Sequence, residues 1–187
     1  MSAEIVALET KHRGWASLHV ARVRLADGAT VERVIEDHGS AACVLPYDPQ
    51  RKVATMVRQL RVPVLHAGGG EMLIEPPAGI IDPGEDAETA ALREATEETG
   101  LRLATIEKIA TVWTMPGVST ERMSMFIGTY SASDRIGAGG GIDDEGIEVV
   151  EIVLSDLAAM ADAGTLTDLK AFTLVQTLRL RRPELFR

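Results

Sequence analysis

Alternating apolar and polar side chains mark the N-terminal third of the chain. The period of two over residues 16–25 and 30–37, around an Asp-Gly turn, predicts an antiparallel β-hairpin. Residues 41–47 and 52–60 follow as a second pair of expected strands, joined by a turn at Asp48 and Pro49. Because residues 41–47 carry few polar side chains, we expect a strand that is buried on both faces.

The apolar period changes to that of a helix after Pro83 and Gly84. Asp86 favours a helix start, and Gly100 stands where a left-handed C-terminal cap is expected. We expect Ala91, Leu92 and Ala95 to form the packing face of this helix. Glu94, Glu97 and Glu98 are expected on a different arc of the helix.

The remaining periodic segments complete the expected order of strands, one central helix, further strands and final helices. These segments are strands at 105–113, 122–130 and 147–154, a helix with Ser155 as N-cap and Gly164 at its end, and a last helix from Asp168. This order predicts an α/β (α+β) fold with a mixed β-sheet sandwiched between helices. We divide the chain into an N-terminal antiparallel β region, 1–38, and a main domain, 39–187.

Composition and charge narrow the class of protein. The 187 residues are 45% apolar and 25% charged, which is typical of a globular domain. The formal net charge of −9 argues against nucleic acid as the main partner, because phosphate backbones require an excess of Lys and Arg. The single cysteine, Cys43, favours a reducing cytoplasm and a buried structural thiol. No apolar run approaches the roughly 20 residues of a membrane span, so no membrane contact is expected.

Glu94, Glu97 and Glu98 bring three carboxylates within about one turn of the central helix. Like charges at this spacing repel by a few tenths of a kcal/mol per pair, whereas a hard divalent cation converts the same oxygens into a binding site. The alternative interpretation is a solvated acidic face, which is what most Glu-rich helices are.

The spacing decides between these interpretations. Residues 79–101 fit Gly-x5-Glu-x7-Arg-Glu-U-x-Glu-Glu-x-Gly-U, in which U is apolar. Its seven fixed positions would match by chance on the order of once in a million such chains. The segment resembles the signature of the Nudix hydrolases, the Nudix box, and the match is complete.

The resemblance implies a β-α-β core that cleaves a nucleoside diphosphate linked to another group. It implies Mg²⁺ as cofactor, with Mn²⁺ as the alternative, and two or three ions. Glu94 and Glu98 would be the main metal ligands, with support from Glu97 and from the backbone carbonyl of Ala78. Glu85 and Arg93 would organise the site.

The segments around the box resemble the ADP-ribose and GDP-mannose pyrophosphatases of this family. The lead-in EPPAGIIDPGE would place Glu75 beside the metals. The loop MPGVSTERMSMFIG contains Pro116 and Gly117 and offers Glu121 as the catalytic base. Glu145, in a later Gly-rich loop, is a second candidate for the base or for a substrate contact.

The same subgroup suggests which residues meet the substrate and how the chain assembles. VRQLRVPV resembles the RQ-x-R strand, so Arg58 and Arg61 are expected to reach the terminal sugar phosphate or the diphosphate. As bare strand residues they would more often be solvated charges. The N-terminal β region in this group is exchanged or packed across a dimer, which predicts a homodimer.

Together these resemblances predict hydrolysis of a nucleotide sugar to a nucleoside monophosphate and a sugar phosphate, with ADP-ribose or GDP-mannose as substrate. One alternative is a Nudix hydrolase for NADH, dinucleoside polyphosphates or damaged nucleotides. Another, less favoured, is a non-catalytic nucleotide-sugar sensor, since every carboxylate of the box is present.

Overall fold

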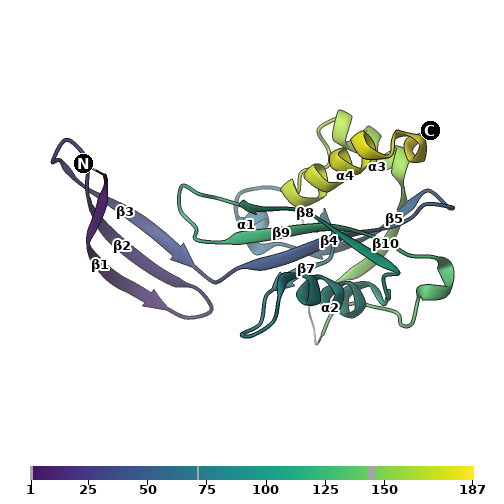
Figure 1. Cartoon of the computed structure of the whole chain (residues 1–187), viewed down its shortest axis with the longest axis horizontal. Coiled ribbons are helices and arrows are strands. Elements are labelled where there is room, and N and C mark those ends of the chain that lie inside the picture. The colour runs from purple at the N-terminus through teal and green to yellow at the C-terminus, as the bar shows by residue number, and fades with distance from the viewer. Residues whose placement is uncertain (1, 71, 143–145) are drawn as a thin grey trace. The chain divides into compact units, whose positions relative to one another are not determined.

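The computed structural model describes residues 2–70, 72–142 and 146–187 (Figure 1). They form two compact units. One consists of Met1–Ser40 and Thr111–Met123, and the other of Ala41–Ala110 and Ser124–Arg187.

The first unit contains a three-stranded antiparallel sheet in the order β1-β2-β3. Its strands are β1 (Glu4–Arg13), β2 (Ser17–Arg24) and β3 (Thr30–Asp37). The predicted hairpin is confirmed as β2 and β3, with a turn in which the Leu25 N–H donates to the Ala29 carbonyl at 2.8 Å. Gly28 has φ 87° there, a conformation that favours glycine. Strand β1 was missed, because nearly all of its residues are exposed and it shows no buried face.

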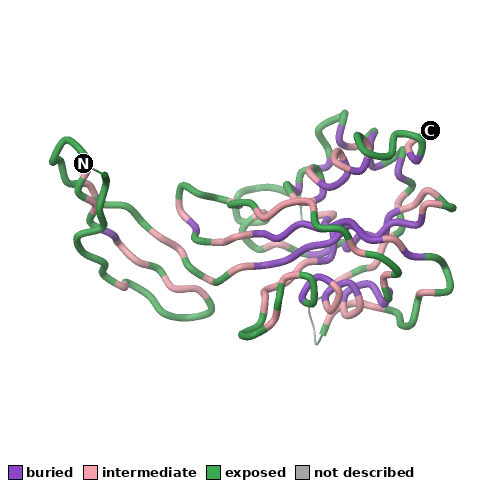
Figure 2. The backbone as a smooth tube through the Cα atoms, viewed as in Figure 1, coloured by how far each residue is buried: buried purple, intermediate pink, exposed green. Residues whose placement is uncertain are grey.

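The second unit contains the main sheet, in the order β10-β5-β4-β9-β8, with β6 paired to β5 and β7 to β4, except that residues 111–113 of β8 and 122–123 of β9 are counted with the first unit. Its strands are β4 (Ala41–Asp48), β5 (Val53–Leu60), β6 (Met72–Glu75), β7 (Ala78–Ile80), β8 (Thr105–Trp113), β9 (Arg122–Thr129) and β10 (Glu148–Val153). All eight residues of β4 are buried, as the sequence predicts (Figure 2).

Three helices cover the two faces of this sheet: α2 (Ala87–Thr99), α3 (Leu154–Asp162) and α4 (Leu169–Arg181). The short helix α1 (Val62–His66) buries no residue, and short 3-10 turns lie at Ala132–Asp134 and Pro183–Phe186. Helix α2 lies on one side of the sheet, and α3 and α4 lie on the other (Figure 1). Both α2 and α4 contact β4, which explains why that strand has no solvated face. The predicted α+β sandwich is therefore confirmed.

The two faces of β4 supply the core. Ala42 and Val44 pack with Ala91, Ala95 and Phe126 beneath α2. Small alanines on both surfaces let the helix approach the sheet closely. Cys43 is fully buried in the same strand, which confirms the expected buried thiol.

The start of α3 differs from the prediction that Ser155 is its N-cap. Ser155 lies inside α3, whose N-cap is Val153, and no side chain caps this helix. The reason is that α3 begins directly where β10 ends, which leaves no loop in which Ser155 can act as a cap. Arg179 of α4 donates to Asp162 of α3 at 2.7 Å and joins the two helices. None of the described helices combines the length and apolar composition needed to cross a bilayer.

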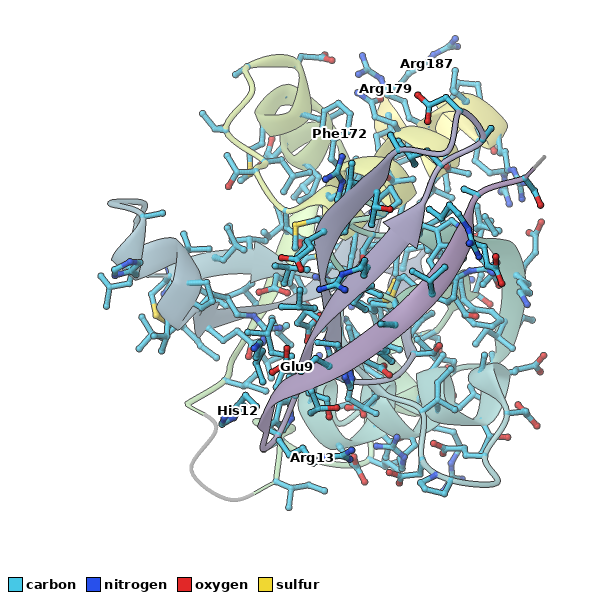
Figure 3. The ribbon with its side chains drawn as sticks, turned by 90° about the vertical axis from the view of Figure 1, so that its left-hand side faces the viewer. Glu9, His12, Arg13, Phe172, Arg179 and Arg187 are labelled. Atoms are coloured by element: carbon cyan, nitrogen blue, oxygen red, sulfur yellow. The ribbon has the colours of Figure 1, made fainter. Side chains whose placement is uncertain are left out.

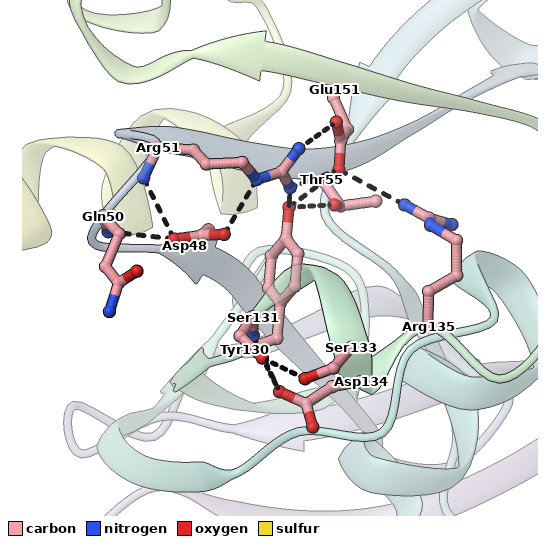
Figure 4. Close-up of polar contacts among 10 residues, drawn as sticks. All are labelled: Asp48, Gln50, Arg51, Thr55, Tyr130, Ser131, Ser133, Asp134, Arg135 and Glu151. Carbon is pink, nitrogen blue, oxygen red and sulfur yellow. Dashed lines mark hydrogen bonds and ion pairs between the residues drawn. The ribbon is translucent and has the colours of Figure 1, made fainter.

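A partly buried polar network joins β4, β5 and β10 with Tyr130, the residue that follows β9 (Figure 4). The Tyr130 hydroxyl lies 2.7 Å from the Thr55 hydroxyl and 3.1 Å from the Glu151 carboxylate. Arg51 bonds to Glu151 at 2.7 Å and to Asp48 at 2.8 Å. Burial first, and then the neighbouring charge of Glu151, raise the pKa of Tyr130 to about 12.

Tyr130 should therefore make the protein sensitive to alkali. An unfolded Tyr loses its proton near pH 10, whereas folded Tyr130 keeps it to about 12, so stability falls as pH rises through this window. We expect the wild type to lose about 2 kcal/mol more than Tyr130→Phe between these pH values. Urea unfolding at pH 9, 10, 11 and 12 measures the difference. Burial also raises the pKa of Tyr47, so Tyr47→Phe is a comparison that should keep the part of the loss due to Tyr130. Equal slopes for the wild type and Tyr130→Phe would contradict the prediction.

Candidate active site

The box helix α2 is fixed at both ends by the residues that the sequence marks. The Asp86 carboxylate accepts hydrogen bonds from the Glu88 and Thr89 N–H groups at 3.0 and 2.8 Å. Gly100 ends the helix with φ 70°. Both predicted caps are confirmed, and they set the start and the end of the helix that carries the carboxylates.

The expected separation of carboxylates from the packing face is wrong. Glu94 and Glu98 are buried, with 9% and 5% exposure, on the same helix as buried Ala91 and Ala95. Positions 91, 94, 95 and 98 follow the i, i+3, i+4, i+7 rule, so they form one stripe. Leu92, expected in the core, is only half-buried. The helix therefore turns two of its carboxylates inward and leaves Glu97 partly exposed.

Strand β7 holds these two carboxylates in place. The Ala78 N–H donates to Glu98 Oε2 at 3.1 Å. Gly79 faces Glu94 so closely that a Cβ at this position would overlap the Glu94 carboxylate. Both residues of β7 are fixed by pairing with β4, Ala78 opposite Cys43 and Gly79 opposite Ala42. The first glycine of the box is thus required for space beside a carboxylate.

Arg93 links the two halves of the box. Its guanidinium bonds to Glu85 at 3.1 Å, to Glu94 at 2.7 Å and to Glu97 at 3.1 Å. It also donates to the Ile80 carbonyl at 3.0 Å. The Arg93 hydrogen bonds hold the pKa of Glu85 below its usual value. Arg93 therefore fixes the turn before the helix against the carboxylates on it.

A second charged cluster surrounds Glu75, which is only 1% exposed. Arg61 binds both of its oxygens, at 2.6 and 2.9 Å, and Lys170 binds Oε2 at 2.7 Å. Burial raises the pKa of Glu75, but these two cations more than offset it and the net direction is down. The charge of Glu98 helps to raise the pKa of Arg61, after larger contributions from Glu75.

Lys170 and Asp168 were not among the residues predicted for the site. Asp168 bonds to Lys170 at 2.8 Å and also caps α4 by accepting from the Ala171 N–H at 2.7 Å. Its position before the last helix indicates a cap, but nothing in the sequence pairs Lys170 with Glu75.

Two further candidates have different surroundings. Arg58 on β5 lies opposite Glu148 on β10 and forms an exposed ion pair with it at 2.5 Å. Glu145 lies outside the residues that the structure describes.

The Gly-rich segment before residue 143 binds the end of the box helix. The N–H groups of Gly140 and Gly141 donate to the carbonyls of Glu98 and Glu97 at 2.8 and 3.1 Å. Arg135 donates to the Thr99 carbonyl at 2.9 Å and contacts Glu151 at 3.3 Å. These bonds satisfy the last carbonyls of α2 and connect it to the network around Tyr130.

The remaining candidates belong to the first unit. Pro116 and Gly117 form the loop between β8 and β9, which the Val118 N–H closes by donating to the Met115 carbonyl at 3.0 Å. Glu121 follows this loop, and its Oε2 accepts from the Thr114 hydroxyl at 2.8 Å. Its N–H donates to the Ser119 hydroxyl at 3.1 Å.

The donor chemistry of the box suits a hard cation. Glu94, Glu97 and Glu98 offer only oxygen atoms, and two of them are buried beside β7. Within the described ranges, no three His, Cys, Asp or Glu side chains already surround a common point as ligands. Arg93 binds Glu94 and Glu97 instead, and Glu98 accepts from Ala78.

Replacement of Gly79 by Ala tests the space around Glu94. The added methyl group would displace the Glu94 carboxylate, the end of a flexible side chain, so we expect a folded protein with weakened metal affinity. Loss of one well-placed oxygen ligand should raise the Mn²⁺ dissociation constant about 10-fold or more. Calorimetric titration with Mn²⁺ measures this constant. Gly70→Ala, at a position open to solvent, is the control, and unchanged affinity in Gly79→Ala would contradict the assignment.

The fold and the carboxylate helix define the class of protein. The mixed β-sheet is covered by the capped helix α2, on which Arg93 bonds to Glu85, Glu94 and Glu97. Residues 37–169, more than half of the chain, match the NUDIX domain family. This protein belongs to the NUDIX family, as the resemblance of the box predicts.

Individual relatives agree with this family. The chain is 39% identical over 158 residues to a GDP-mannose pyrophosphatase of Cronobacter sakazakii, covering 83% of this chain and 82% of that protein. It is 38% identical over 157 residues to one of Klebsiella pneumoniae, covering 82% and 79%. A crystal structure of an ADP compounds hydrolase superposes with a TM-score of 0.78 at 18% identity, covering 98% and 96% of the two chains. That likeness supports the fold alone.

Proposed function

We propose that this NUDIX hydrolase cleaves the diphosphate bond of a nucleotide sugar and releases a nucleoside monophosphate and a sugar phosphate. The observation that carries the proposal is the complete box, with Glu94 and Glu98 buried against β7. GDP-mannose is the first candidate substrate, because the relatives at 39% and 38% identity are GDP-mannose pyrophosphatases. ADP-ribose is the second, from the resemblance of the EPPAG and Pro-Gly segments.

We propose Mg²⁺, or Mn²⁺ in its place, as the cofactor. Glu94 and Glu98 would hold it, with support from Glu97 and the Ala78 carbonyl. When bound, such ions neutralise the diphosphate and stabilise the charge that develops on the leaving oxygen. Arg93 already orients Glu94 and Glu97, so it would keep the carboxylates in place as the substrate arrives.

The protein's own side chains supply the proton transfer and part of the charge. We assign Glu121 as the base that accepts a proton from the attacking water, with Glu145 as the alternative. Arg61 and Arg58 are assigned to the diphosphate or the terminal sugar phosphate, and Glu75 orients Arg61 through two hydrogen bonds. Because Arg61 is more exposed than Glu75, its outer nitrogen has room for a ligand.

A panel of substrates tests the proposal. Purified protein is supplied with an excess of Mg²⁺ of about 1,000-fold over protein. It is then incubated with GDP-mannose, ADP-ribose, other nucleotide sugars, NADH or a dinucleoside polyphosphate. We expect release of GMP and mannose 1-phosphate to be fastest. Preference for NADH or the dinucleotide would replace the substrate assignment, and no release from any compound would overturn the proposed reaction.

We also propose a homodimer formed through the first unit. Its sheet leaves apolar side chains exposed, among them Ile5 and Leu8 on β1, both 56% exposed. Three strands with so little burial are marginal alone, so a second copy is the natural cover. Sedimentation equilibrium of the wild type and of Ile5→Lys/Leu8→Lys measures the mass. A monomeric wild type would overturn this assignment.

A further inference from the structure

His38 follows β3 and lies between two carboxylates of the first unit. Its Nδ1 is 2.6 Å from Glu36 Oε1, and its Nε2 is 3.6 Å from Glu121 Oε2. The ring stacks on Trp15, with centroids 4.9 Å apart and planes 15° from parallel. The side chains of His38 and Glu121 are each only 15% exposed. Such shielding makes their interaction stronger than that of a surface pair.

Glu36 ties this group to the loop that carries Glu121. The Glu36 N–H donates to the Val118 carbonyl at 2.8 Å, and the Thr120 N–H donates to the Glu36 carbonyl at 3.0 Å. The Ser119 hydroxyl donates to Glu36 Oε2 at 2.7 Å and accepts from the Glu121 N–H at 3.1 Å. The end of β3 therefore fixes the loop backbone without help from His38.

The Glu121 side chain has fewer restraints than its backbone. Its Oε2 accepts from Thr114 at 2.8 Å, and His38 Nε2 lies 3.6 Å from the same oxygen. The Thr114 hydroxyl alone would let the Glu121 carboxylate rotate about that contact. The His38 ring, held by Glu36 and Trp15, sets the direction in which the carboxylate points. The separation of 3.6 Å is slightly longer than a hydrogen bond, and a small shift of the Glu121 side chain would bring the two atoms into hydrogen-bond range.

We propose that His38 is a positioning residue that aims the carboxylate of Glu121, with Glu36 and Trp15 fixing the imidazole. This inference rests on the proposed function, in which Glu121 takes the proton of the attacking water. The Glu36–His38–Glu121 arrangement gives the N-terminal sheet a part in catalysis. It does so within the first unit, through a side chain that touches no substrate.

Three replacements of His38 distinguish the roles of its two ring nitrogens. Gln places an amide N–H near the position of Nε2, so His38→Gln keeps a donor toward Glu121. Asn places one near Nδ1, so His38→Asn keeps the contact with Glu36 and loses the one with Glu121. We expect His38→Ala and His38→Asn to lower kcat about 10- to 100-fold with KM for GDP-mannose unchanged. His38→Gln should recover activity to within a few-fold of wild type.

Two further measurements exclude a merely structural effect. In the Glu121→Gln background, His38→Ala should cause no additional loss of kcat, because the group that it positions is absent. In protein labelled with ¹³C-Glu, the carboxyl resonance of Glu121, identified by its loss in Glu121→Gln, should shift in His38→Ala. His12→Ala, at an exposed position of β1, is the control for both readouts (Figure 3).

The outcomes for this inference and for the proposed function are distinct. A wild type that hydrolyses no member of the panel would overturn the proposed function, and the ¹³C resonance would still decide whether His38 orients Glu121. With an active wild type, additive losses, an unshifted resonance or a His38→Gln variant as poor as His38→Ala would each overturn the inference.

Discussion

Replacing Glu98 by Gln is expected to lower kcat about 100-fold or more while the protein stays folded. The change removes one ligand charge from the proposed metal site, and metal stabilisation of a phosphoryl transition state is worth several kcal/mol, with about 1.4 kcal/mol per tenfold in rate. The fold should tolerate the change, because a Gln oxygen can still accept from the Ala78 N–H that now binds Glu98 at 3.1 Å. Initial rates of GMP release at saturating GDP-mannose and Mg²⁺ measure kcat.

Glu88→Gln is the matched control for this variant. Glu88 lies on the first turn of the same helix and is exposed, so its replacement removes the same charge from outside the buried stripe. We expect its kcat to stay near that of wild type, and thermal unfolding to be similar for all three proteins. Near-full activity in Glu98→Gln would show that the carboxylates of α2 do not hold a catalytic metal.

Local signals in the sequence predicted the ends of α2 and the buried centre of the sheet. Asp86 and Gly100 act through contacts within a few residues, so their roles follow from residue type and spacing. The apolar run of β4 likewise predicts burial on both faces. Such features depend on the chain near them and are readable without the fold.

The direction of the carboxylates depends on more than local pattern. Periodicity placed Glu94 and Glu98 on a different arc of the helix from Ala91, Leu92 and Ala95. The i, i+3, i+4, i+7 stripe that they share with Ala91 and Ala95 contradicts this assignment. The sequence contains the stripe, but only the close approach of Gly79 and the Ala78 N–H shows why two charges are kept on it.

Contacts between distant segments were the least predictable. Glu75 and Lys170 are 95 positions apart, and their ion pair depends on where α4 lies against the sheet. Neither residue carries a local mark of the other, so the sequence gives no reason to choose Lys170. The contact of β3 with the loop after β8 is of the same kind, since Glu36 and Ser119 lie 83 positions apart.

Glu121→Gln is expected to lower kcat about 100- to 10,000-fold, the usual contribution of a positioned general base. Gln cannot take the proton of an attacking water, but its side-chain oxygen can still accept from the Thr114 hydroxyl, now 2.8 Å from Glu121. The backbone bond from residue 121 to the Ser119 hydroxyl also remains, so the loop should keep its conformation. KM for GDP-mannose should therefore change little, and steady-state kinetics over a range of substrate concentrations separates the two constants.

Two controls make this result decisive. Glu32→Gln removes an exposed carboxylate from β3 of the same unit and should leave kcat unchanged. Glu145→Gln tests the other candidate base. If Glu145→Gln loses far more activity than Glu121→Gln, the base is Glu145. Thr114, Ser119 and His38 would then stabilise the loop around Glu121 without positioning a base. A large loss in Glu121→Gln with KM preserved, beside little loss in Glu145→Gln, supports Glu121 as the base, because the interaction lost is then one made in the transition state and not in substrate binding.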